Sequence, residues 1–598
     1  MNKFAFIDAE LSADGKLIVL VAHGEEWQMQ NTALVLTELT PLASQSQKTL
    51  GREGGMTLPL SWAAVVQLSS TFAGGWRTGP ALTEWIAAEL ARREYQEPKL
   101  FVEPPRGYVP RSYQVEGAAL IRELGSGLLW DEPGTGKTVT AVLGLVERAA
   151  QRHPTLPVLV VAPSSVVDTW VDHFRAWAPF WRVTAWRGSP KKRMALLHTS
   201  DIYVASYGVV RQDAQDMDPR HNPLIALRPN ALVADEAHKI KDQGAEQSRA
   251  VRRIAQKSQL FLGLTGTPIT HNPGDIWPQL YCVSPNANPS RERWIKRYCH
   301  HVQKDYSVEA LGFNHREDEY RLTIKGQSRR VAKADVLHEL PDKVYSVRHV
   351  ELPPQWRKVY EQMERDMLAE LPDGGQLSVM GVLAKLTRLQ QLAAAAADVT
   401  VTTSIEPDLI TGLPIEKEHT QVHLKFPSWK VDEMIEVMNE RPGRKVVVFS
   451  PSRQLVMLAA QKAAATGRAV GHIVGGQTAR ERTANVDAFQ AGKLDAVFVT
   501  TGAGGVGLTL TAGSVACFLN RPFSLVESTQ AEDRIHRIGA EIHDSVEIID
   551  IVAKNTIETR VRQIIKQRAG QLSDFVRDPR IVAEILGGAS VTNIRKAG

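Results

Sequence analysis

Residues 128–138, LLWDEPGTGKT, decide the fold of much of this chain. An apolar strand leads into a turn with two glycines, and the apolar helix sequence VTAVLGLVERAA follows directly. Glycines let backbone N–H groups close around phosphate oxygens, and the N-terminus of the following helix favours an anion. The stretch therefore predicts a loop that binds nucleotide phosphates through Gly134, Thr135 and Gly136, with Lys137 on the outer phosphates and Thr138 on magnesium.

One residue departs from the usual pattern of such a loop. Asp131 stands six residues before Lys137, where Gly or Ala is typical. Taken alone, the stretch has an alternative interpretation as a glycine-rich turn closed by a surface lysine, which would bind no nucleotide.

A second motif, ALVADEAHK at residues 231–239, places two acids directly after an apolar strand. Ligands of open α/β sheets bind beyond the carboxyl ends of the strands, which is where these acids emerge. We expect Asp235 to hold magnesium through water and Glu236 to orient and deprotonate an attacking water. The alternative is an acidic pair at a helix N-terminus, and the phosphate loop earlier in the chain favours the catalytic interpretation.

The spacing of short apolar runs predicts two α/β lobes built on parallel sheets, at residues 99–285 and 426–575. The runs of the first lobe are GLLW, VLVVAP, DIYVAS, ALVADE and LFLGLTGT, and those of the second are KVVVFS, AVGHIV, DAVFVTT, VACFLN and VEIIDIVA. Residues 286–425 are richer in charge and in helical pattern, and are predicted to be an insertion and linker rather than a third sheet. Residues 576–598 are expected to form a C-terminal tail.

Residues 1–98 are predicted to form a small α+β unit that ends at a proline-rich boundary. Apolar runs such as KLIVLVAHG and NTALVLTEL come first and indicate extended segments, and helical patterns follow. Ser61 is placed to cap a helix, and the spacing of apolar residues in ALTEWIAAELARR indicates another. We expect Trp62 and Trp85 to pack in the core of this unit.

Composition restricts the class of protein. The chain has 598 residues, too many for one core, with 43% hydrophobic and 23% charged residues and a formal net charge of +5, which permits a polyanionic partner. No apolar run approaches the ~20 residues of a membrane span, and the first residues lack the apolar stretch of a signal peptide, which predicts a cytoplasmic protein with no membrane partner. Three scattered cysteines predict neither a disulfide framework nor a zinc site.

Five stretches, taken in order, resemble the motifs of superfamily-two helicase-like ATPases. They are DEPGTGKT, DEAHKIKDQGAEQSRAV, LTGTPITHNPGDIWPQL, TGAGGVGLTLTAGSVACFLNRP and STQAEDRIHRIG. The Ile-Lys after DEAH, the Asp-x-Trp after Thr-Gly-Thr-Pro and the Asn-Arg-Pro make the chain similar to the Swi/Snf family of double-stranded DNA translocases over residues 105–570. The compact linker and RRVAKADVLHELPDK look closest to the annealing-helicase branch (HepA-related protein).

The resemblance implies two RecA-like lobes and roles for individual residues. Gln114 matches the glutamine that reads adenine, and Thr265, Thr267 and Gln530 match positions that couple hydrolysis to movement of the lobes. Four strand-end loops match those facing the nucleic acid, where small hydroxyls suit phosphate contact. Their candidate DNA-binding residues are Ser164, Ser165, Ser206, Ser450, Thr500 and Thr501. Each loop taken singly is equally an ordinary strand-end loop.

Two arginines in QAEDRIHRIG, Arg534 and Arg537, lie three residues apart in the second lobe. If the segment is helical, both guanidinium groups share one face and can reach the γ-phosphate when the lobes close. The alternative is a helix whose arginines pair with Glu532 or Asp533. Basic stretches at 291–297 and 325–330 are either clamps for duplex phosphates or solvated faces.

The resemblance implies a motor that depends on ATP and Mg²⁺ and moves on, remodels or reanneals double-stranded or forked DNA. The alternatives are a helicase that separates strands of DNA or RNA, and a nucleotide switch that displaces a DNA-bound protein such as RNA polymerase. We expect a monomer, and replication, repair or transcription proteins are the expected further partners.

Overall fold

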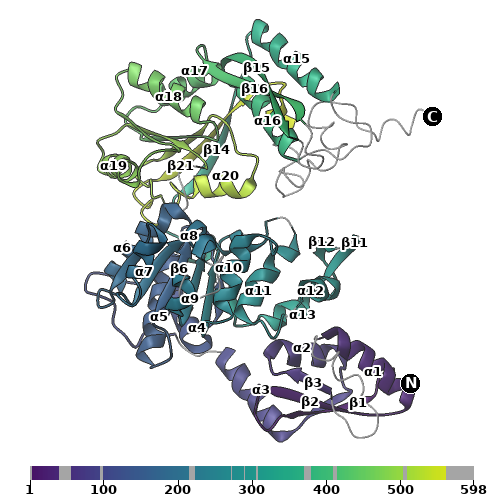
Figure 1. The fold of residues 1–598 in the computed structure, drawn as a ribbon. Helices are drawn as coiled ribbons and strands as arrows, with labels where there is room; N and C mark the ends of the chain where they lie inside the picture. The colour runs from purple at the N-terminus through teal and green to yellow at the C-terminus, as the bar shows by residue number, and fades with distance from the viewer. Residues whose placement is uncertain are drawn as a thin grey trace, which may run out of the picture. The chain divides into compact units, whose positions relative to one another are not determined.

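A computed structural model gives the structure of the chain, which divides into two compact units, Met1–Val336 and Leu337–Gly598. Figure 1 shows the ribbon with its labelled elements. The structure describes residues 3–39, 56–93, 98–213, 222–270, 272–288, 290–304, 307–369, 379–407, 414–502 and 508–560. The predicted tail at 576–598 lies outside these residues. The division after Val336 falls inside the stretch predicted to be insertion and linker, and the finer domain boundaries stay predictions.

The first part of unit 1 is an α+β fold, as expected. Its sheet has the order β3-β2-β1-β4, in which β1 is antiparallel to β2 and parallel to β4. Three helices pack against the sheet face that presents Ile7 and Leu20. The elements are β1 (Phe6–Leu11), β2 (Leu17–His23), α1 (Glu26–Leu39), β3 (Met56–Pro59), α2 (Trp62–Thr71), β4 (Trp76–Thr78) and α3 (Pro80–Arg93).

Two expectations for this part were wrong, whereas the predicted helix in ALTEWIAAELARR and the packing of Trp85 against the core are confirmed. The run at 31–39 belongs to α1 and is not extended, and Trp62 packs outside the core of this fold, with its Nε1 donating to the Leu322 carbonyl at 2.9 Å. Ser61 caps α2 as predicted, because its side chain accepts from the Ala64 N–H. The helix therefore begins where the sequence indicated.

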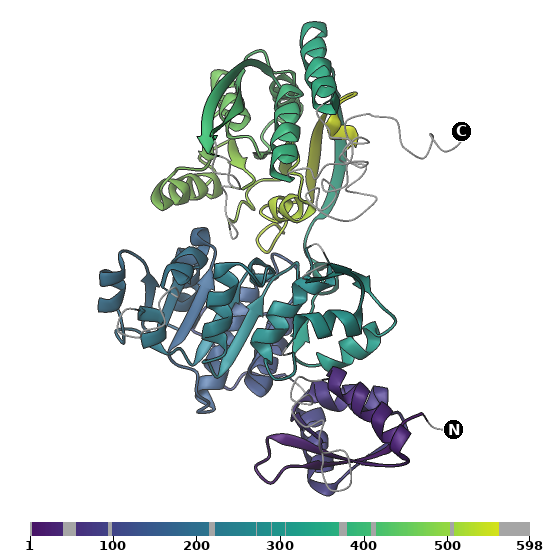
Figure 2. The same cartoon turned by 45° about the vertical axis from the view of Figure 1, so that its right-hand side comes forward.

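The second part of unit 1 is built on a seven-stranded sheet of order β13-β5-β10-β9-β6-β8-β7, with every neighbouring pair parallel. Its strands are β5 (Gly127–Leu129), β6 (Val158–Ala162), β7 (Val183–Trp186), β8 (Ile202–Ser206), β9 (Ala231–Asp235), β10 (Leu260–Leu264) and β13 (Ser328–Arg329). All five predicted strands are present. Their runs are apolar throughout because helices cover both faces, as Figure 2 shows.

The helices of this lobe lie on opposite faces of the sheet. On one face, α8 (Tyr207–Asp213), α10 (Glu246–Ala255) and α11 (Trp277–Val283) share a core with Tyr203 and Phe261. On the other, α4 (Ser112–Leu124), α5 (Lys137–Ala150) and α6 (Val167–Trp177) pack together. Two short helices, α7 (Pro190–Ala195) and α9 (Pro223–Leu227), complete the lobe.

The segment from 290 to 336 combines helices with strands that the sequence pattern did not indicate. It holds α12 (Arg291–Tyr298), the hairpin of β11 (Cys299–Lys304) and β12 (Ser307–Phe313), α13 (Glu317–Thr323), β13 and α14 (Lys333–Val336). Trp294, Tyr298, Phe313 and Tyr320 form an aromatic cluster inside it. The chain then returns to the sheet of the lobe, where β13 pairs with β5.

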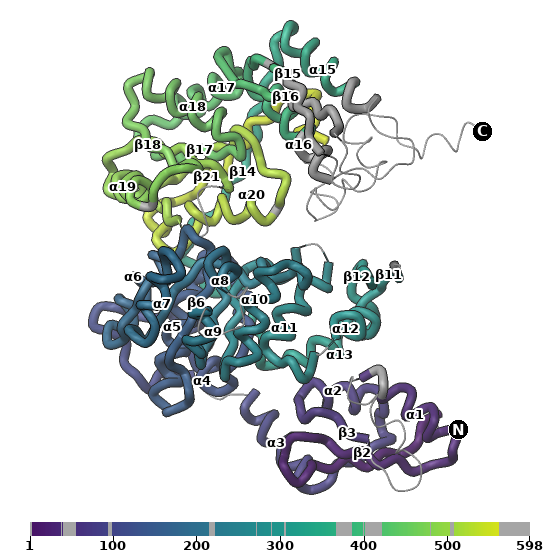
Figure 3. The backbone as a smooth tube through the Cα atoms, in the orientation of Figure 1, coloured from purple at the N-terminus to yellow at the C-terminus, as the bar shows by residue number. Residues whose placement is uncertain are grey.

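Unit 2 is built on a second all-parallel sheet, of order β14-β21-β20-β17-β19-β18. Its strands are β14 (Asp342–Val350), β17 (Val446–Ser450), β18 (Val470–Ile473), β19 (Ala496–Thr500), β20 (Val515–Phe518) and β21 (Ser545–Ala553), so the five predicted strands are confirmed. Its helices are α15 (Pro354–Ala369), α16 (Val379–Leu392), α17 (Trp429–Asn439), α18 (Arg453–Ala465), α19 (Ala479–Gln490) and α20 (Leu525–Glu532). Figure 3 shows the hairpin of β15 (Ala396–Pro407) and β16 (Pro414–Lys425) beside α16 and α17.

Candidate nucleotide-binding site

The predicted phosphate loop lies between β5 and α5. Gly134 and Gly136 have φ values of 87° and 83°, in the left-handed region that favours glycine. Gly136 is the residue before the first turn of α5, and that helix begins at Lys137. The two glycines are thus required by the backbone of the loop, which carries its N–H groups to the N-terminus of a 14-residue helix.

Side chains on both sides hold the loop in shape. The Lys137 Nζ donates to the carbonyls of Asp131 at 2.8 Å and of Glu132 at 3.2 Å, so the ammonium group lies across the loop. The Tyr113 hydroxyl and the Gln114 Nε2 both donate to the Thr135 carbonyl, at 2.9 and 3.2 Å. These contacts come from α4, so α4 fixes one wall of the loop.

Gln114 has a role that the sequence did not predict. Its Nε2 supports the phosphate loop, and its Oε1 accepts from the Arg111 N–H at 3.0 Å at the start of α4. The residue is only 4% exposed. Recognition of adenine by this side chain stays a prediction.

The predicted acid pair lies at the same edge of the same sheet. Asp235 is the last residue of β9, and Glu236 follows it in the left-handed region with φ 53°, a strained conformation for a non-glycine residue. Only β10 separates β9 from β5, so the two acids and the phosphate loop emerge side by side from parallel strands. Burial is the largest single influence on the pKa of both carboxyls and raises it. The positive charge of Lys137 acts on both in the opposite direction.

Three neighbours fix Asp235. The Trp170 Nε1 of α6 donates to its Oδ2 at 2.9 Å, and the Glu236 N–H donates to its Oδ1 at 3.0 Å. The Tyr207 hydroxyl donates to its main-chain carbonyl at 2.8 Å. Burial, and then the negative charge of Glu236, raise the pKa of Asp235 to about 6.

Glu236 shifts the other way. Burial raises its pKa, but hydrogen bonding to His238 and the positive charges of His238, Lys137 and Lys239 outweigh burial, so the net pKa lies below its ordinary value. Two adjacent carboxyls whose pKa values are shifted in opposite directions are typical of an active site in which the two groups have different roles. The oxygen donors present, the Asp235 carboxylate and the Thr138 hydroxyl, are of the type that Mg²⁺ prefers, so the residues fit that ion.

A chain of polar contacts leads from Glu236 to the predicted coupling threonines. The His238 Nδ1 lies 3.2 Å from the Glu236 Oε2 and 2.9 Å from the Thr265 Oγ1. The Thr265 Oγ1 in turn accepts from the Thr267 N–H at 3.1 Å. Thr265 follows β10, between the phosphate loop and the acids, and is fully buried. Both threonines therefore connect to the acid pair.

Sequence reasoning missed His238, Trp170 and Tyr207. His238 carried a signal, because it lies two residues after Glu236 in DEAH. Trp170 and Tyr207 carried none, because they approach Asp235 from α6 and α8, far away in the sequence.

The candidate DNA-binding residues of unit 1 follow two strands of the same sheet. Ser164 is exposed and Ser165 half-buried, just beyond the carboxyl end of β6. Ser206 ends β8, and its Oγ accepts from the Val209 N–H. They lie at the edge of the sheet that carries Asp235, because β6 and β8 run parallel to β9. Their contact with DNA stays a prediction.

The candidates of unit 2 are more enclosed. Ser450 is fully buried, and its Oγ accepts from the Ser452 N–H at 3.1 Å. Thr500 and Thr501 are 4% and 5% exposed, and the Thr500 Oγ1 donates to the Ile473 carbonyl at 3.4 Å. Residues 503–505 of the same loop lie outside the described residues. DNA contact by these three hydroxyls also stays a prediction.

The arginine pair of unit 2 does not lie on a helix face. Helix α20 carries the half-buried Gln530 and ends at Glu532, so Arg534 and Arg537 lie in the turn beyond it. The condition for a shared helix face is therefore not met, because the helix ends before both arginines. The Arg534 Nη2 donates to the Thr501 carbonyl at 3.0 Å, and the Arg537 Nη1 donates to the Leu508 carbonyl at 3.4 Å.

Arg534 is buried in unit 2, and Arg537 is half-buried. Arg534 is 6% exposed and lies 5.9 Å from the centroid of the Phe449 ring. Burial lowers the pKa of Arg534 to about 10 and lowers that of Arg537 as well. Of the two partners in the alternative interpretation, Glu532 pairs with Arg521 and Lys343. Asp533 lies 3.6 Å from Lys343, and its charge raises the pKa of Arg537 against the larger effect of burial.

Comparison with known proteins identifies the family. Residues 81–396 match the SNF2-related domain, and residues 429–539 match the helicase conserved C-terminal domain. The first match covers more than half of the chain. The chain belongs to the SNF2-related family. The resemblance to Swi/Snf proteins is thus confirmed, and the finer placement in the annealing-helicase branch stays a prediction.

This SNF2-related chain is similar to several curated helicases. It is 27% identical over 467 residues to an uncharacterized ATP-dependent helicase of Mycoplasma genitalium, covering 77% of this chain and 41% of that protein. It is 24% identical over 487 residues to a putative ATP-dependent helicase/translocase of Bacillus subtilis, covering 79% of this chain and 49% of that protein. The chain thus spans less than half the length of these relatives.

A solved structure of the SNF2-related type also matches. The Sulfolobus solfataricus SWI2/SNF2 ATPase core in complex with dsDNA is 20% identical, with a TM-score of 0.38, and the match covers 83% of this chain and all of that one.

Among the residues that the structure describes, no helix has the length and apolar character needed to cross a membrane.

Proposed function

We propose that this chain hydrolyses ATP with Mg²⁺ and uses the reaction to move on, or remodel, double-stranded DNA. The observation that carries the proposal is the joint position of Lys137 and the Asp235–Glu236 pair. They lie at the carboxyl edge of one parallel sheet, the Lys137 charge acts on both acids, and the two acids have pKa values shifted in opposite directions. Membership of the SNF2-related family supports the same function.

The residues of unit 1 divide the work on ATP. The N–H groups of the glycine loop and Lys137 bind the outer phosphates. Asp235 and Thr138 hold Mg²⁺, which when bound neutralises charge on the phosphate oxygens. Glu236, kept ionised by its lowered pKa, orients the attacking water and accepts its proton.

Hydrolysis is coupled to movement by groups on both units. The contacts from Glu236 through His238 to Thr265 and Thr267 carry a change at the γ-phosphate to the neighbouring strand end. In unit 2, Arg534 and Arg537 offer desolvated guanidinium groups, which bind phosphate oxygens strongly. We infer that they meet the γ-phosphate when the lobes close, so that the reaction requires closure.

Steady-state ATPase measurements test the proposal. Rates are measured without nucleic acid and with duplex DNA, forked DNA, single-stranded DNA and RNA. Duplex DNA is expected to stimulate most, and Lys137→Ala and Arg534→Ala are each expected to lower the stimulated rate by at least ~10²-fold. Lys191→Ala and Arg480→Ala, at exposed positions of α7 and α19, are the matched controls and keep the wild-type rate.

Each alternative has its own result. Equal stimulation by RNA favours a helicase that separates strands. ATP hydrolysis that no nucleic acid changes favours the nucleotide switch. A chain that hydrolyses no ATP, with or without DNA, contradicts the proposal altogether.

A further inference from the structure

Residues 325–333, here called the strap, run along the outer side of β5 and on to the phosphate loop. The N–H groups of Leu128 and Trp130 donate to the carbonyls of Gln327 and Arg329, both at 2.8 Å. The N–H of Glu132, inside the phosphate loop, donates to the Val331 carbonyl at 2.9 Å. Three successive hydrogen bonds therefore join the strap to the strand and the loop that follows it.

Side-chain contacts of Asp131, the residue that departs from the usual phosphate-loop pattern, add to these backbone hydrogen bonds. The Asp131 Oδ1 accepts from the Val331 N–H at 3.0 Å and lies 3.5 Å from the Arg329 Nε. The Asp131 and Arg329 side chains are 1% and 8% exposed. The Glu132 Oε2 accepts from the Lys333 N–H at 3.0 Å. The aspartate that stands in place of the usual Gly or Ala therefore binds the strap.

Helix α4 leaves room for the arginine of this pair. A Cβ added at Gly117 would lie 2.7 Å from the Arg329 Nη1, closer than real Cβ atoms approach. The guanidinium group therefore lies between α4 and Asp131, beneath the phosphate loop. The basic stretch 325–330 had two interpretations, a clamp for DNA phosphates or a solvated face, and Arg329 fits neither because its side chain is buried against Asp131. Lys325 and Arg330 are exposed, so for them both interpretations stay open.

The strap is also tied to the N-terminal α+β fold. The Arg93 Nη1, at the end of α3, donates to the Lys325 carbonyl, where the strap begins. Gly326 lies directly against Arg93 with φ 78°, and a Cβ there would lie 3.0 Å from the Arg93 side chain. Arg93 itself is held by Glu89 and by the ring of Trp62, 5.1 Å from its Cζ.

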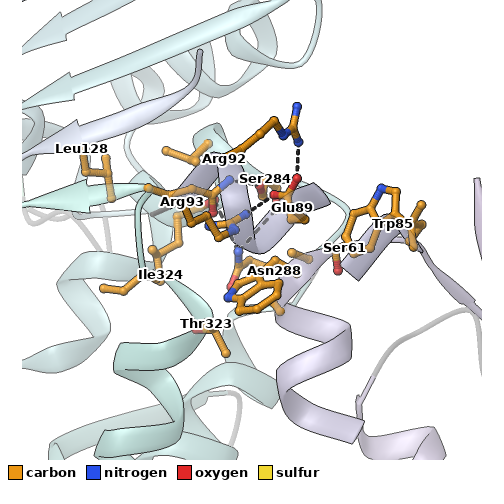
Figure 4. Close-up of a pocket in the computed structure, with 17 residues that line it drawn as sticks. Ser61, Trp85, Glu89, Arg92, Arg93, Leu128, Ser284, Asn288, Thr323 and Ile324 are labelled. Carbon is orange, nitrogen blue, oxygen red and sulfur yellow. Dashed lines mark hydrogen bonds and ion pairs between the residues drawn. The ribbon is translucent and has the colours of Figure 1, made fainter. Parts of the chain in front are cut away.

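Figure 4 shows this junction from close by. Arg93, Glu89 and Trp85 of α3 face Thr323, Ile324 and Asn288 of the lobe around a cavity of about 200 Å³. Arg92 lies at its outer side and pairs with Glu89. The Arg92 side chain is 56% exposed and that of Arg93 is 2% exposed, so the two neighbouring arginines differ in burial although they share one partner.

We propose that Asp131 and Arg329 are positioning residues that hold the phosphate loop in the shape that accepts a nucleotide, and that the N-terminal fold supports the same loop through Arg93 and the strap. The inference rests on the proposed binding of ATP. The link to the phosphate-binding residues is short, because Lys137 donates to the carbonyls of Asp131 and Glu132. A buried ion pair contributes little net stability, which fits a role in position rather than in folding.

Nucleotide binding to the full chain tests the proposal. The dissociation constant of a fluorescent ADP analogue is measured for Asp131→Asn, Arg329→Met and Arg329→Lys. We expect the dissociation constant to rise about tenfold in Asp131→Asn and Arg329→Met, which corresponds to about 1.4 kcal/mol. Arg329→Lys should give an intermediate value, because lysine keeps the charge but lacks the planar guanidinium group. The KM for ATP is expected to rise by a similar factor while kcat at saturating ATP stays within about twofold, a division that a general loss of folded protein would not produce.

The matched pair Arg93→Met and Arg92→Met tests the N-terminal part. Arg93→Met is expected to weaken binding about threefold, and Arg92→Met to leave it unchanged. Hydrogen exchange of the amides of residues 131, 132 and 134–136 without nucleotide provides a second readout, and is expected to speed up in Asp131→Asn, Arg329→Lys and Arg93→Met but not in Arg92→Met. If Arg329→Met fails to fold, Arg329→Lys and Arg93→Met still give both readouts.

Two outcomes would overturn the inference. If Asp131→Asn and Arg329→Lys bind the analogue as wild type does, while Lys137→Ala loses binding, the pair does not position the loop. If Arg93→Met and Arg92→Met behave alike in both readouts, the N-terminal fold does not support it. Failure of the proposed function looks different, because the wild-type chain and Lys137→Ala would then both fail to bind the analogue, and only the exchange experiment would still report on the strap.

Discussion

Replacing Asp235 by asparagine is expected to stabilise the chain while removing its activity. Asp235 has a pKa raised to about 6 from 3.8, chiefly by burial and then by the charge of Glu236. Each pH unit corresponds to about 1.4 kcal/mol, so the ionised Asp235 destabilises unit 1 by about 3 kcal/mol at neutral pH. Asparagine removes that charge and keeps an oxygen for the Trp170 N–H.

Asparagine also loses one interaction. Asp235 accepts from both the Trp170 Nε1 and the Glu236 N–H, and an amide with a single oxygen can satisfy only one of them in this geometry. The lost hydrogen bond costs about 1 kcal/mol. The expected net gain is about 1–2 kcal/mol in the free energy of unfolding, or about 2–5 °C in Tm.

The pH dependence gives this prediction its signature. Because the folded-state pKa lies above the unfolded value, folded Asp235 binds its proton more tightly, and stability falls as the pH rises from about 4 to about 6. The gain in free energy of unfolding of Asp235→Asn over the wild-type chain is therefore largest above pH 6, and at pH 5 it is smaller by about 1 kcal/mol.

Calorimetry of the full chain in EDTA without nucleotide, at pH 7.5 and pH 5, makes the comparison. Asp172→Asn is the control, because Asp172 is 73% exposed and its substitution should leave Tm unchanged. A lower Tm for Asp235→Asn than for the wild-type chain at pH 7.5, or a gain in Tm of the same size at pH 5, would contradict this prediction. ATP hydrolysis with Mg²⁺ by the same variant should be lost, because the variant lacks the carboxylate that we propose as the ligand of the ion.

Three further substitutions have defined outcomes. Lys430→Met should lower the free energy of unfolding of unit 2, measured in urea, by about 3–5 kcal/mol. The reason is that the Glu558 carboxylate, 2.7 Å from the buried Lys430 Nζ, loses its cation. The double variant with Glu558→Gln should recover part of the loss. Trp170→Phe should move the acid limb of kcat/KM to higher pH, because the indole hydrogen bond lowers the pKa of Asp235. Gly117→Ala should lower Tm by an amount corresponding to about 1–3 kcal/mol, because its Cβ would lie 2.4 Å from a side-chain methyl carbon of α5.

The strands that the sequence revealed are those buried on both faces. All five residues of Val158–Ala162 and of Leu260–Leu264 are buried, so each reads as an unbroken apolar run. Strand β14 was missed because it forms an edge of its sheet and alternates exposed and half-buried residues. Strand β13 was missed for a related reason, since it is a two-residue edge strand with no apolar pattern.

Helix α1 shows the opposite error. The run at 31–39 is short and apolar, and such runs do not distinguish a strand from a buried helix. Leu36 and Leu39 pack on the sheet of the N-terminal fold from a helix that begins earlier, at Glu26. Tertiary packing, rather than the local pattern, decides its conformation.

The candidate site divides in the same way. Lys137, Asp235 and Glu236 were predicted because each directly follows a strand or a glycine turn that the sequence identifies. Trp170 and Arg329 were not assigned to the site, because their contacts with Asp235 and Asp131 join segments 65 and 198 residues apart. Only the folded chain brings these side chains to Asp235 and Asp131, so their local sequence does not predict the contacts.

Displacement of a triplex-forming strand tests whether ATP hydrolysis drives movement along duplex DNA. The full chain is incubated with ATP and Mg²⁺ on a duplex that carries a third strand in its major groove, with Lys137→Ala as the inactive control. We expect ATP-dependent release of the third strand by the wild-type chain, with the duplex strands still paired. Stimulation of ATPase activity by duplex DNA without any release of the third strand would contradict it.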